Sequence, residues 1–236
     1  MNLKNTTTHE IGKIIHSLKS KDSSGYDGIS LRILKISAPY VLSPLTFIFN
    51  KSLLTDIFPE RLKFLEVTPI HKKGDGIDFL NYRPISVLAS FSIIIEKIIY
   101  RRLYSYLNTN SLLVNEQFGF RAKLSTDTAT YDFLNKVLSS LDKKDYVGGL
   151  FCDLQKAFDC VNHDILLAKL NFYGITGIAY KLIRSYLVSR YQRVIMKGSK
   201  HSKLTSMWEH VKHGVPQGSV MGPLLFLIYI NFKQNS

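Results

Sequence analysis

The chain has 236 residues, and its 45% hydrophobic content excludes an intrinsically disordered protein. Its 31 Lys and Arg residues outnumber its 18 Asp and Glu residues, which gives a net charge of +13 at pH 7. A surplus of this size indicates a polyanionic partner, and nucleic acid is the first expectation.

The cysteine count and the hydropathy pattern predict an intracellular protein without a membrane partner. Cys152 and Cys160 lack the Cys-x-x-Cys spacing and favour a reducing compartment, the nucleus or the cytoplasm, over a disulfide framework. The longest uncharged run, residues 36–50, contains two prolines and is too short to span a bilayer. Residues 1–8 are polar, which does not fit a signal peptide.

Helical patterns dominate the first part of the chain. Thr7 and Glu10 form a capping box, which predicts a short amphipathic helix after them. Residues 30–55 predict helical pieces that are interrupted by Pro39 and Pro44.

A strand and a basic hairpin tip are predicted next. β-Branched residues favour a strand over residues 64–70, and Lys72 and Lys73 follow it in a glycine-containing turn. A basic loop tip can bind phosphate, although such lysines can also serve solubility alone. Apolar spacing then predicts a helix over residues 91–106 and a further capped helix that ends near residue 141.

An apolar, β-prone run at residues 146–152 predicts a buried strand that places Asp153 at its end. From Phe158 onward the apolar spacing is helical and predicts an amphipathic helix. Because burying an unpaired charge is costly, Asp153 should be exposed, paired with a basic group or bound to a cation. Capping the next helix is the alternative role. Asp159 and Asp164 are expected to be surface or capping carboxylates.

Between residues 165 and 208 the chain contains eight basic residues and no acidic one, interleaved with five aromatic residues. Phosphates should screen such a surface, with the aromatic rings either stacked on bases or packed in the core. The arginines expected to contact nucleic acid are Arg184, Arg190 and Arg193. His201, His210 and His213 match no zinc-site spacing, so zinc is not expected.

Six strings of the chain carry a family resemblance. They are SGYDGI (24–29), VTPIHKKGD (67–75), NYRPIS (81–86), NEQFGFR (115–121), FCDLQKAFDCVNH (151–163) and HGVPQGSVMGPLLF (213–226). In this order they resemble the motifs of reverse transcriptases of LINE-type (non-long-terminal-repeat) retrotransposons, jockey-like elements especially. The fifth string resembles the catalytic motif A and the sixth resembles motif B.

The resemblance implies an RNA-directed DNA polymerase that extends a DNA primer on an RNA template with deoxynucleoside triphosphates. Asp153 and the backbone carbonyl of Leu154 would hold two Mg²⁺ ions, which stabilise the attacking and leaving oxygens. Phe158 would lie under the sugar, where its ring leaves no room for a 2′-hydroxyl.

The other site residues follow from the same resemblance. Lys72, Lys73 and Arg83 would bind the triphosphate, and Arg83 is the strongest candidate because its guanidinium can hold two phosphate oxygens. The Gln217 amide would hydrogen-bond the nucleotide, beside Gly218, which lets the backbone approach closely. Arg121 would lie near the template.

The resemblance further implies an α/β (α+β) fold of the right-hand polymerase type. Residues 1–118 would form a fingers-like region with an N-terminal extension. Residues 119–236 would form a partial palm, with an intervening basic fingers-like segment at about residues 170–212 and without a thumb.

The family completes its metal site with motif C, a Tyr-x-Asp-Asp-like hairpin that follows motif B and has no counterpart in this sequence. The expectation is an incomplete Mg²⁺ site and no nucleotide incorporation by this chain alone. Two hypotheses stay open. One is a truncated reverse transcriptase domain, and the other is a noncatalytic nucleic-acid-binding remnant.

Overall fold

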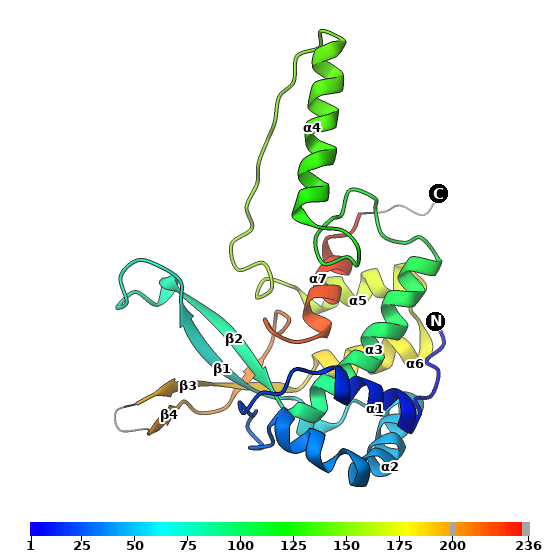
Figure 1. Cartoon of the computed structure of the whole chain (residues 1–236), viewed down its shortest axis with the longest axis vertical. Helices are drawn as coiled ribbons and strands as arrows, with labels where there is room; N and C mark the ends of the chain where they lie inside the picture. Colours follow the sequence, from blue (N-terminus) through cyan, green and yellow to red (C-terminus); the bar gives the residue numbers. More distant parts are fainter. Residues whose placement is uncertain (199–201, 233–236) are drawn as a thin grey trace.

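A computed structural model of the chain describes residues 1–198 and 202–232 and shows a mixed α/β fold. In Figure 1 most helices pack together in one half of the molecule, while the strands form a sheet that extends away from them. Helix α4 projects from this assembly. The coarse fold class expected from the sequence is confirmed.

Helices and strands alternate in groups along the chain. The helices are α1 (Thr8–Ser17), α2 (Leu31–Thr55), α3 (Ser90–Thr109), α4 (Thr126–Asp142), α5 (His163–Phe172), α6 (Gly177–Leu187) and α7 (Met221–Ile230). The strands are β1 (Phe64–His71), β2 (Tyr82–Leu88), β3 (Arg190–Lys197), β4 (Lys203–Thr205) and β5 (Glu209–Val211). Short 3₁₀ turns precede β1 at Glu60–Leu62 and β2 at Phe79–Asn81.

The sheet joins segments that are far apart in the sequence. Its strands lie in the order β2-β1-β3-β4, and β5 also pairs with β3. β1 and β2 form an antiparallel hairpin, in which Leu65 lies opposite Leu88 and His71 opposite Tyr82. β3 pairs with β1 in parallel over residues 64–67 of β1 only. The outer half of the hairpin therefore extends beyond this parallel pairing.

The helical half is built around α3, whose Ile94, Ile95 and Ile98 are fully buried. Helices α1, α2 and α7 all contact α3. Helix α7 is apolar on nearly all sides, as expected for a helix inside a core. Each fully buried aliphatic side chain contributes about 1.5–3 kcal/mol. This core holds the end of β2 and the start of α7 at fixed positions.

Helix α2 differs from the interrupted helix that its prolines predicted. It is continuous from Leu31 to Thr55, with Pro39 and Pro44 inside it. Both prolines are exposed, so the carbonyls that lose an N–H partner lie on the side where water can bond them. Within the described ranges, α2 is the one helix long and apolar enough to cross a membrane, by length and composition alone.

The predicted strand at residues 146–152 is wrong. The chain there is irregular and exposed, and it runs back alongside α4, which itself has no buried residue (Figure 1). A strand needs a hydrogen-bonding neighbour, and none of the described strands pairs with this segment. A ring contact joins Phe151 of this segment to Phe133 of α4, with centroids 5.9 Å apart. Asp153 therefore lies on an exposed segment instead of at a strand end.

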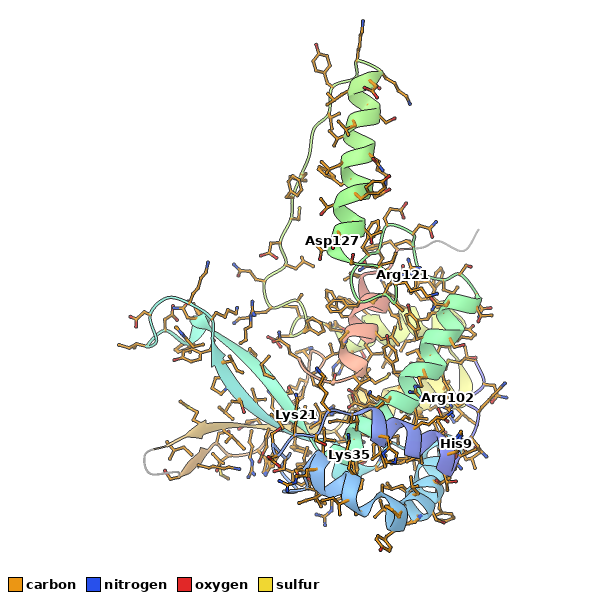
Figure 2. The ribbon with its side chains drawn as sticks, viewed as in Figure 1. His9, Lys21, Lys35, Arg102, Arg121 and Asp127 are labelled. Carbon is orange, nitrogen blue, oxygen red and sulfur yellow. The ribbon has the colours of Figure 1, made fainter. Side chains whose placement is uncertain are left out.

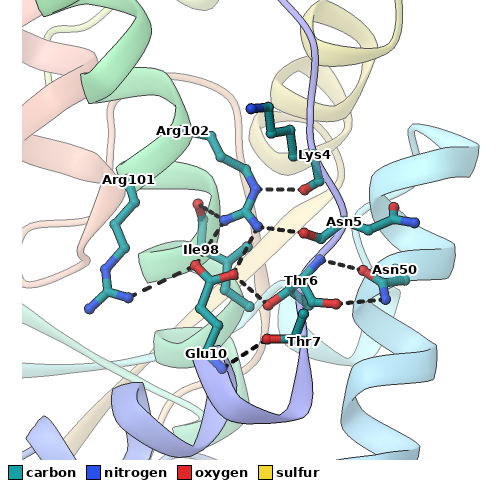
Figure 3. Close-up of polar contacts among 9 residues, drawn as sticks. All are labelled: Lys4, Asn5, Thr6, Thr7, Glu10, Asn50, Ile98, Arg101 and Arg102. Atoms are coloured by element: carbon teal, nitrogen blue, oxygen red, sulfur yellow. Dashed lines mark hydrogen bonds and ion pairs between the residues drawn. The ribbon is translucent and has the colours of Figure 1, made fainter.

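The N-terminal segment is tied to α3 by a network around Arg102 (Figure 3). Arg102 Nη2 lies 2.9 Å from Glu10 Oε2, and Arg102 Nε donates to the Lys4 carbonyl at 2.7 Å. Thr6 N donates to Asn50 Oδ1 at 2.7 Å, which joins the same segment to α2. Hydrogen bonding from Arg102 holds the pKa of Glu10 below its usual value.

Candidate active site

A cavity of about 700 Å³ lies between the β1–β2 hairpin, β3 and two loops of the second half of the chain. Five predicted site residues line it: Lys72, Arg83, Leu154, Phe158 and Gln217. They come from three segments that are far apart in the sequence. A cavity of this size suits a ligand as large as a nucleotide.

The hairpin forms the basic side of the cavity. Lys72 N donates to the Asn81 carbonyl at 2.8 Å, which closes the base of the hairpin tip. Arg83 stands in β2 opposite Ile70. Lys72 and Arg83 are exposed, and neither forms an ion pair with a carboxylate in the described part of the chain. Lys73 belongs to the same turn but is not among the residues that line the cavity.

Residues 155–160 form a turn that brings Phe158 to the cavity. Val215 N donates to the Phe158 carbonyl at 2.9 Å. The Phe158 ring stacks on Phe226 of α7, with centroids 5.0 Å apart. The predicted helix through Phe158 is wrong, because α5 begins only at His163, where the preceding asparagine accepts hydrogen bonds from the first N–H groups of the helix.

Gln217 lies in the loop between β5 and α7, and this loop packs against β2. The Gln217 carbonyl accepts a hydrogen bond from Ser86 N at 2.8 Å. Gly218 has φ +115°, and a Cβ added there would lie 2.8 Å from the Ser86 carbonyl oxygen. Glycine is therefore required at this position by the close approach of two backbones.

Comparison with known proteins places these motifs in one family. A family model described as reverse transcriptase (RNA-dependent DNA polymerase) matches residues 70–234. The chain belongs to the reverse transcriptase family.

Curated relatives agree with this assignment. The chain is 33% identical over 234 residues to the probable RNA-directed DNA polymerase from transposon BS of Drosophila melanogaster, with 96% of this chain and 24% of that protein covered. It is 32% identical to the RNA-directed DNA polymerase from mobile element jockey of Drosophila funebris, with 94% and 24% covered. The predicted resemblance to a LINE-type reverse transcriptase is confirmed. The chain spans about a quarter of the length of these relatives.

The residues present do not form a complete metal site for a reverse transcriptase. Asp153 is exposed, and Leu154 lines the cavity. No group of three or more His, Cys, Asp or Glu residues that could hold a metal ion occurs within residues 1–198 and 202–232. Asp153 and the Leu154 carbonyl therefore supply only part of the oxygen ligands that a divalent ion needs.

Two residues that the motifs did not single out also line the cavity, Lys156 and Asp159. Desolvation raises the pKa of Asp159, and the positive charge of Lys156 opposes that rise. Asp159 is exposed, as expected for a surface carboxylate, and it lines the cavity as well. A turn predicted at residues 155–160 in place of a helix would have indicated Lys156 and Asp159 as cavity residues, because the turn brings neighbouring residues to one cavity. Asp164 lies in the first turn of α5, as expected.

Two of the three arginines expected on nucleic acid are engaged within the reverse transcriptase fold. Arg190 is 1% exposed, and its Nη1 donates to the Tyr186 carbonyl at 3.0 Å, so its predicted contact with nucleic acid is wrong. Arg193 Nε donates to Glu66 Oε1 at 3.1 Å, and its guanidinium lies 4.5 Å from the centroid of Trp208. The prediction counted acidic residues in the same segment only, whereas Glu66 comes from β1.

Arg184 and Arg121 differ in how far their side chains are free. Arg184 is exposed on α6 and forms no ion pair with a carboxylate of the described ranges, so its contact with nucleic acid stays a prediction. Arg121 lies at the foot of α4 (Figure 2), and its Nη1 donates to the Val114 carbonyl at 2.8 Å. Arg121 thus stabilises its own loop, and its contact with the template stays a prediction.

Proposed function

We propose that this chain is the nucleotide-binding and template-binding part of an RNA-directed DNA polymerase of a LINE-type retrotransposon. Its substrates would be a deoxynucleoside triphosphate, a DNA primer and an RNA template. The observation that carries the proposal is the cavity that brings Lys72, Arg83, Phe158 and Gln217 together from separate motifs. The relatives from jockey and transposon BS, which are named as RNA-directed DNA polymerases, support the same activity.

The chemistry of the cavity suits a nucleotide. Lys72 and Arg83 would bind the triphosphate, and the rigid fork of Arg83 suits two phosphate oxygens at once. Phe158 packs in a cluster of three rings with Phe226 and Phe120, so its ring would form a fixed surface under the sugar and exclude a 2′-hydroxyl. The Gln217 side chain would hydrogen-bond the nucleotide while its backbone stays fixed to β2.

Mg²⁺ is the cofactor that we propose. Two such ions, when bound, stabilise the attacking and leaving oxygens of phosphoryl transfer. Asp153 and the Leu154 carbonyl are the residues of this chain that would hold them. Nucleotide phosphates, water and other parts of a longer protein would supply the remaining ligands.

A fingers and partial palm arrangement is proposed for the two parts of the chain. Residues 1–118 would be fingers-like and residues 119–236 a partial palm. Strands β3 to β5 support the intervening segment at about residues 170–212, because they extend the sheet of the β1–β2 hairpin.

Titration of the purified chain with dTTP tests the nucleotide site. Arg83→Ala should weaken binding roughly tenfold or more, because a charge-assisted contact to phosphate is lost. Arg32→Ala is the matched control, since Arg32 is exposed and lies 3.6 Å from Asp22, which is not a cavity residue. An equal loss in both variants would show that binding reflects overall charge.

A noncatalytic nucleic-acid-binding protein is the second candidate, and the lack of further metal-ligating side chains grouped with Asp153 in the described residues favours it. Primer extension on an RNA template, with Mg²⁺ and with Mn²⁺, separates the two. Incorporation that disappears in Asp153→Asn supports the polymerase. Primer-template binding without incorporation, in the longest expressed form of the protein, supports the second candidate.

A further inference from the structure

Strand β2 and helix α3 form one continuous unit on one side of the cavity. Arg83 and Ser86 belong to β2, and α3 begins at Ser90. The loop that carries Gln217 comes from the other end of the chain and contacts this unit through the hydrogen bond from Ser86 N to the Gln217 carbonyl. The distance between Arg83 and Gln217 across the cavity therefore depends on how the loop is held to β2 and α3.

Glu96 of α3 holds the far end of the same loop. Its carboxylate is 0% exposed, and its Oε2 accepts hydrogen bonds from Val220 N at 2.9 Å and from Met221 N at 3.2 Å. Its other oxygen, Oε1, accepts from Ser92 Oγ at 3.3 Å. These contacts lie just after Gly218 and just at the start of α7.

The start of α7 needs such a partner. The N-cap residue is Val220, which has no side-chain oxygen and makes no side-chain cap hydrogen bond. Ser219 Oγ accepts a hydrogen bond from Gly222 N at 2.8 Å, so the amides of Val220 and Met221 are the ones that need a further partner. The first N–H groups of a helix have no partner within the helix, and leaving them buried without one is costly. A carboxylate also interacts favourably with the positive end of the helix dipole. Glu96 therefore does from α3 what a cap residue does in most helices.

A buried carboxyl group at position 96 needs a reason beyond packing, because an apolar side chain could fill the same space. Complete burial raises the pKa of Glu96, and the positive charge of buried Arg190 opposes that rise. Arg190 Nε and Nη2 have no hydrogen-bond partner within the described residues, so the positive charge of Arg190 is only partly compensated. Replacing buried charges by apolar groups is often neutral or stabilising. The hydrogen bonds to Val220 and Met221 are the specific feature that an apolar residue could not provide.

We propose that Glu96 is a positioning residue for nucleotide binding, which fixes Gln217 at its distance from Arg83 by holding the loop to α3. This inference rests on the proposed function of the cavity. Glu96 does not line the cavity, so it acts through the backbone of residues 217–221. It should affect recognition of the nucleoside more than recognition of the phosphates.

Three variants and two ligands test the proposal. Glu96→Ala removes both hydrogen bonds to the loop, and Glu96→Gln keeps an acceptor oxygen. Ser92→Ala is the control: it removes the Ser92 Oγ bonds to Glu96 Oε1 and to the Leu62 carbonyl, and leaves both bonds to the loop. Binding of dTTP and of inorganic triphosphate is measured by calorimetry. Hydrogen exchange of the Val220 and Met221 amides is measured on the same proteins.

Glu96→Ala should weaken dTTP binding roughly tenfold, because a small displacement of a positioning group is costly. Triphosphate binding should change less than about threefold, since Lys72 and Arg83 stay in place. Exchange at Val220 and Met221 should accelerate strongly. Glu96→Gln should restore most of the affinity and protection, and Ser92→Ala should resemble the parent.

The possible failures can be told apart. A parent chain that binds neither ligand overturns the proposed function, and with it the nucleotide role of Glu96. Equal losses of dTTP and triphosphate, or unchanged amide exchange in Glu96→Ala, overturn the positioning role alone. If Glu96→Ala does not fold, Glu96→Gln carries the test. The backbone amides of Val220 and Met221 should then exchange roughly threefold faster than in the parent, because a side-chain amide oxygen is a weaker hydrogen-bond acceptor than a carboxylate oxygen. Unchanged rates would overturn the inference.

Discussion

The loop at residues 212–220 carries Gln217, and the segment at residues 145–154 carries Asp153. The two regions differ greatly in how firmly they are fixed to the rest of the protein. The loop is anchored at both ends of its turn, to Ser86 of β2 and to Glu96 of α3. The segment has no strand partner among the described residues, and Tyr146, Leu150 and Phe151 are largely exposed.

Hydropathy alone predicts that the segment at residues 145–154 is held more firmly than the loop. The segment is the more apolar of the two and was expected to be buried, while the loop reads as a short turn of Pro, Gln and Gly. An apolar, β-prone run becomes a strand only where a second strand supplies hydrogen bonds and a surface to pack on. A tight turn, in contrast, is specified locally and needs only a few contacts to be fixed.

The largest expected effect concerns the buried charge behind the loop. Arg190→Ala removes the positive charge near Glu96 and leaves a buried carboxylate less compensated, which should destabilise the fold by about 3–5 kcal/mol. Urea unfolding measures this loss. The exposed Arg184→Ala is the matched variant and should change stability by less than about 0.5 kcal/mol.

The variants Arg184→Ala and Arg190→Ala also separate effects on folding from effects on nucleic-acid binding. If Arg184 contacts a phosphate, Arg184→Ala should lower the log-log salt slope of binding by about one. Arg190→Ala should leave that slope unchanged in the folded fraction. A lower slope with full stability in Arg190→Ala would contradict the buried position of this side chain.

Glycine substitutions compare the loop and the segment directly. Gly218→Ala forces a Cβ to 2.8 Å from the Ser86 carbonyl oxygen at φ +115°, and should cost about 2–3 kcal/mol and weaken dTTP binding. Gly148→Ala meets nothing within 4 Å in the exposed segment and should be close to neutral. Thermal unfolding of both variants measures the difference. Equal effects would mean that the two regions are equally constrained.

Separate substitutions of Phe158 and Phe151 compare a cavity residue with a residue of the exposed segment in their effect on ligand selection. Phe158→Ala should reduce discrimination between dUTP and UTP, which differ only at the 2′ position, by about tenfold, roughly 1.4 kcal/mol, because a truncated ring leaves room for a 2′-hydroxyl. Phe151→Ala, in the exposed segment, should leave the dUTP to UTP affinity ratio unchanged. If Phe158→Ala also keeps the parent ratio, the Phe158 ring only packs against Phe226.

The sequence predicted the components of the site better than the elements that carry them. The motifs identified Lys72, Arg83, Leu154, Phe158 and Gln217, and all five line one cavity. The strand before Asp153 and the helix through Phe158 were wrong, because short apolar runs do not reveal whether a partner strand or an earlier cap is present.

Long-range pairing explains the other misses. The local count of charges in residues 165–208 could not show that Arg193 meets Glu66 from β1, or that Arg190 lies near Glu96 from α3. The anchoring of the loop by Glu96 was likewise hidden, since Glu96 lies in a helix whose pattern indicated only core packing and a basic face. These contacts join residues that lie in different elements, far apart in the sequence.

The smallest expected effect concerns a third irregular segment, residues 1–7, which is anchored by side chains to α3 and α2. Glu10→Gln should destabilise the protein by about 0.5–1 kcal/mol at pH 7, because the ion pair with Arg102 is partly exposed. Hydrogen bonding from Arg102 lowers the folded-state pKa of Glu10, so its stabilisation is fully present above the ordinary pKa of a glutamate. That stabilisation is lost as the pH falls through the lowered pKa.

The difference in unfolding free energy between the parent and Glu10→Gln should therefore stay constant from pH 7 to about pH 5 and shrink below about pH 4. Denaturant unfolding across this range measures it. Glu209→Gln is the control, since Glu209 is exposed and forms no ion pair within the described residues. A difference for Glu10→Gln that grows toward low pH would mean that folding raises the pKa of Glu10, and would contradict a stabilising contact between Glu10 of α1 and Arg102 of α3.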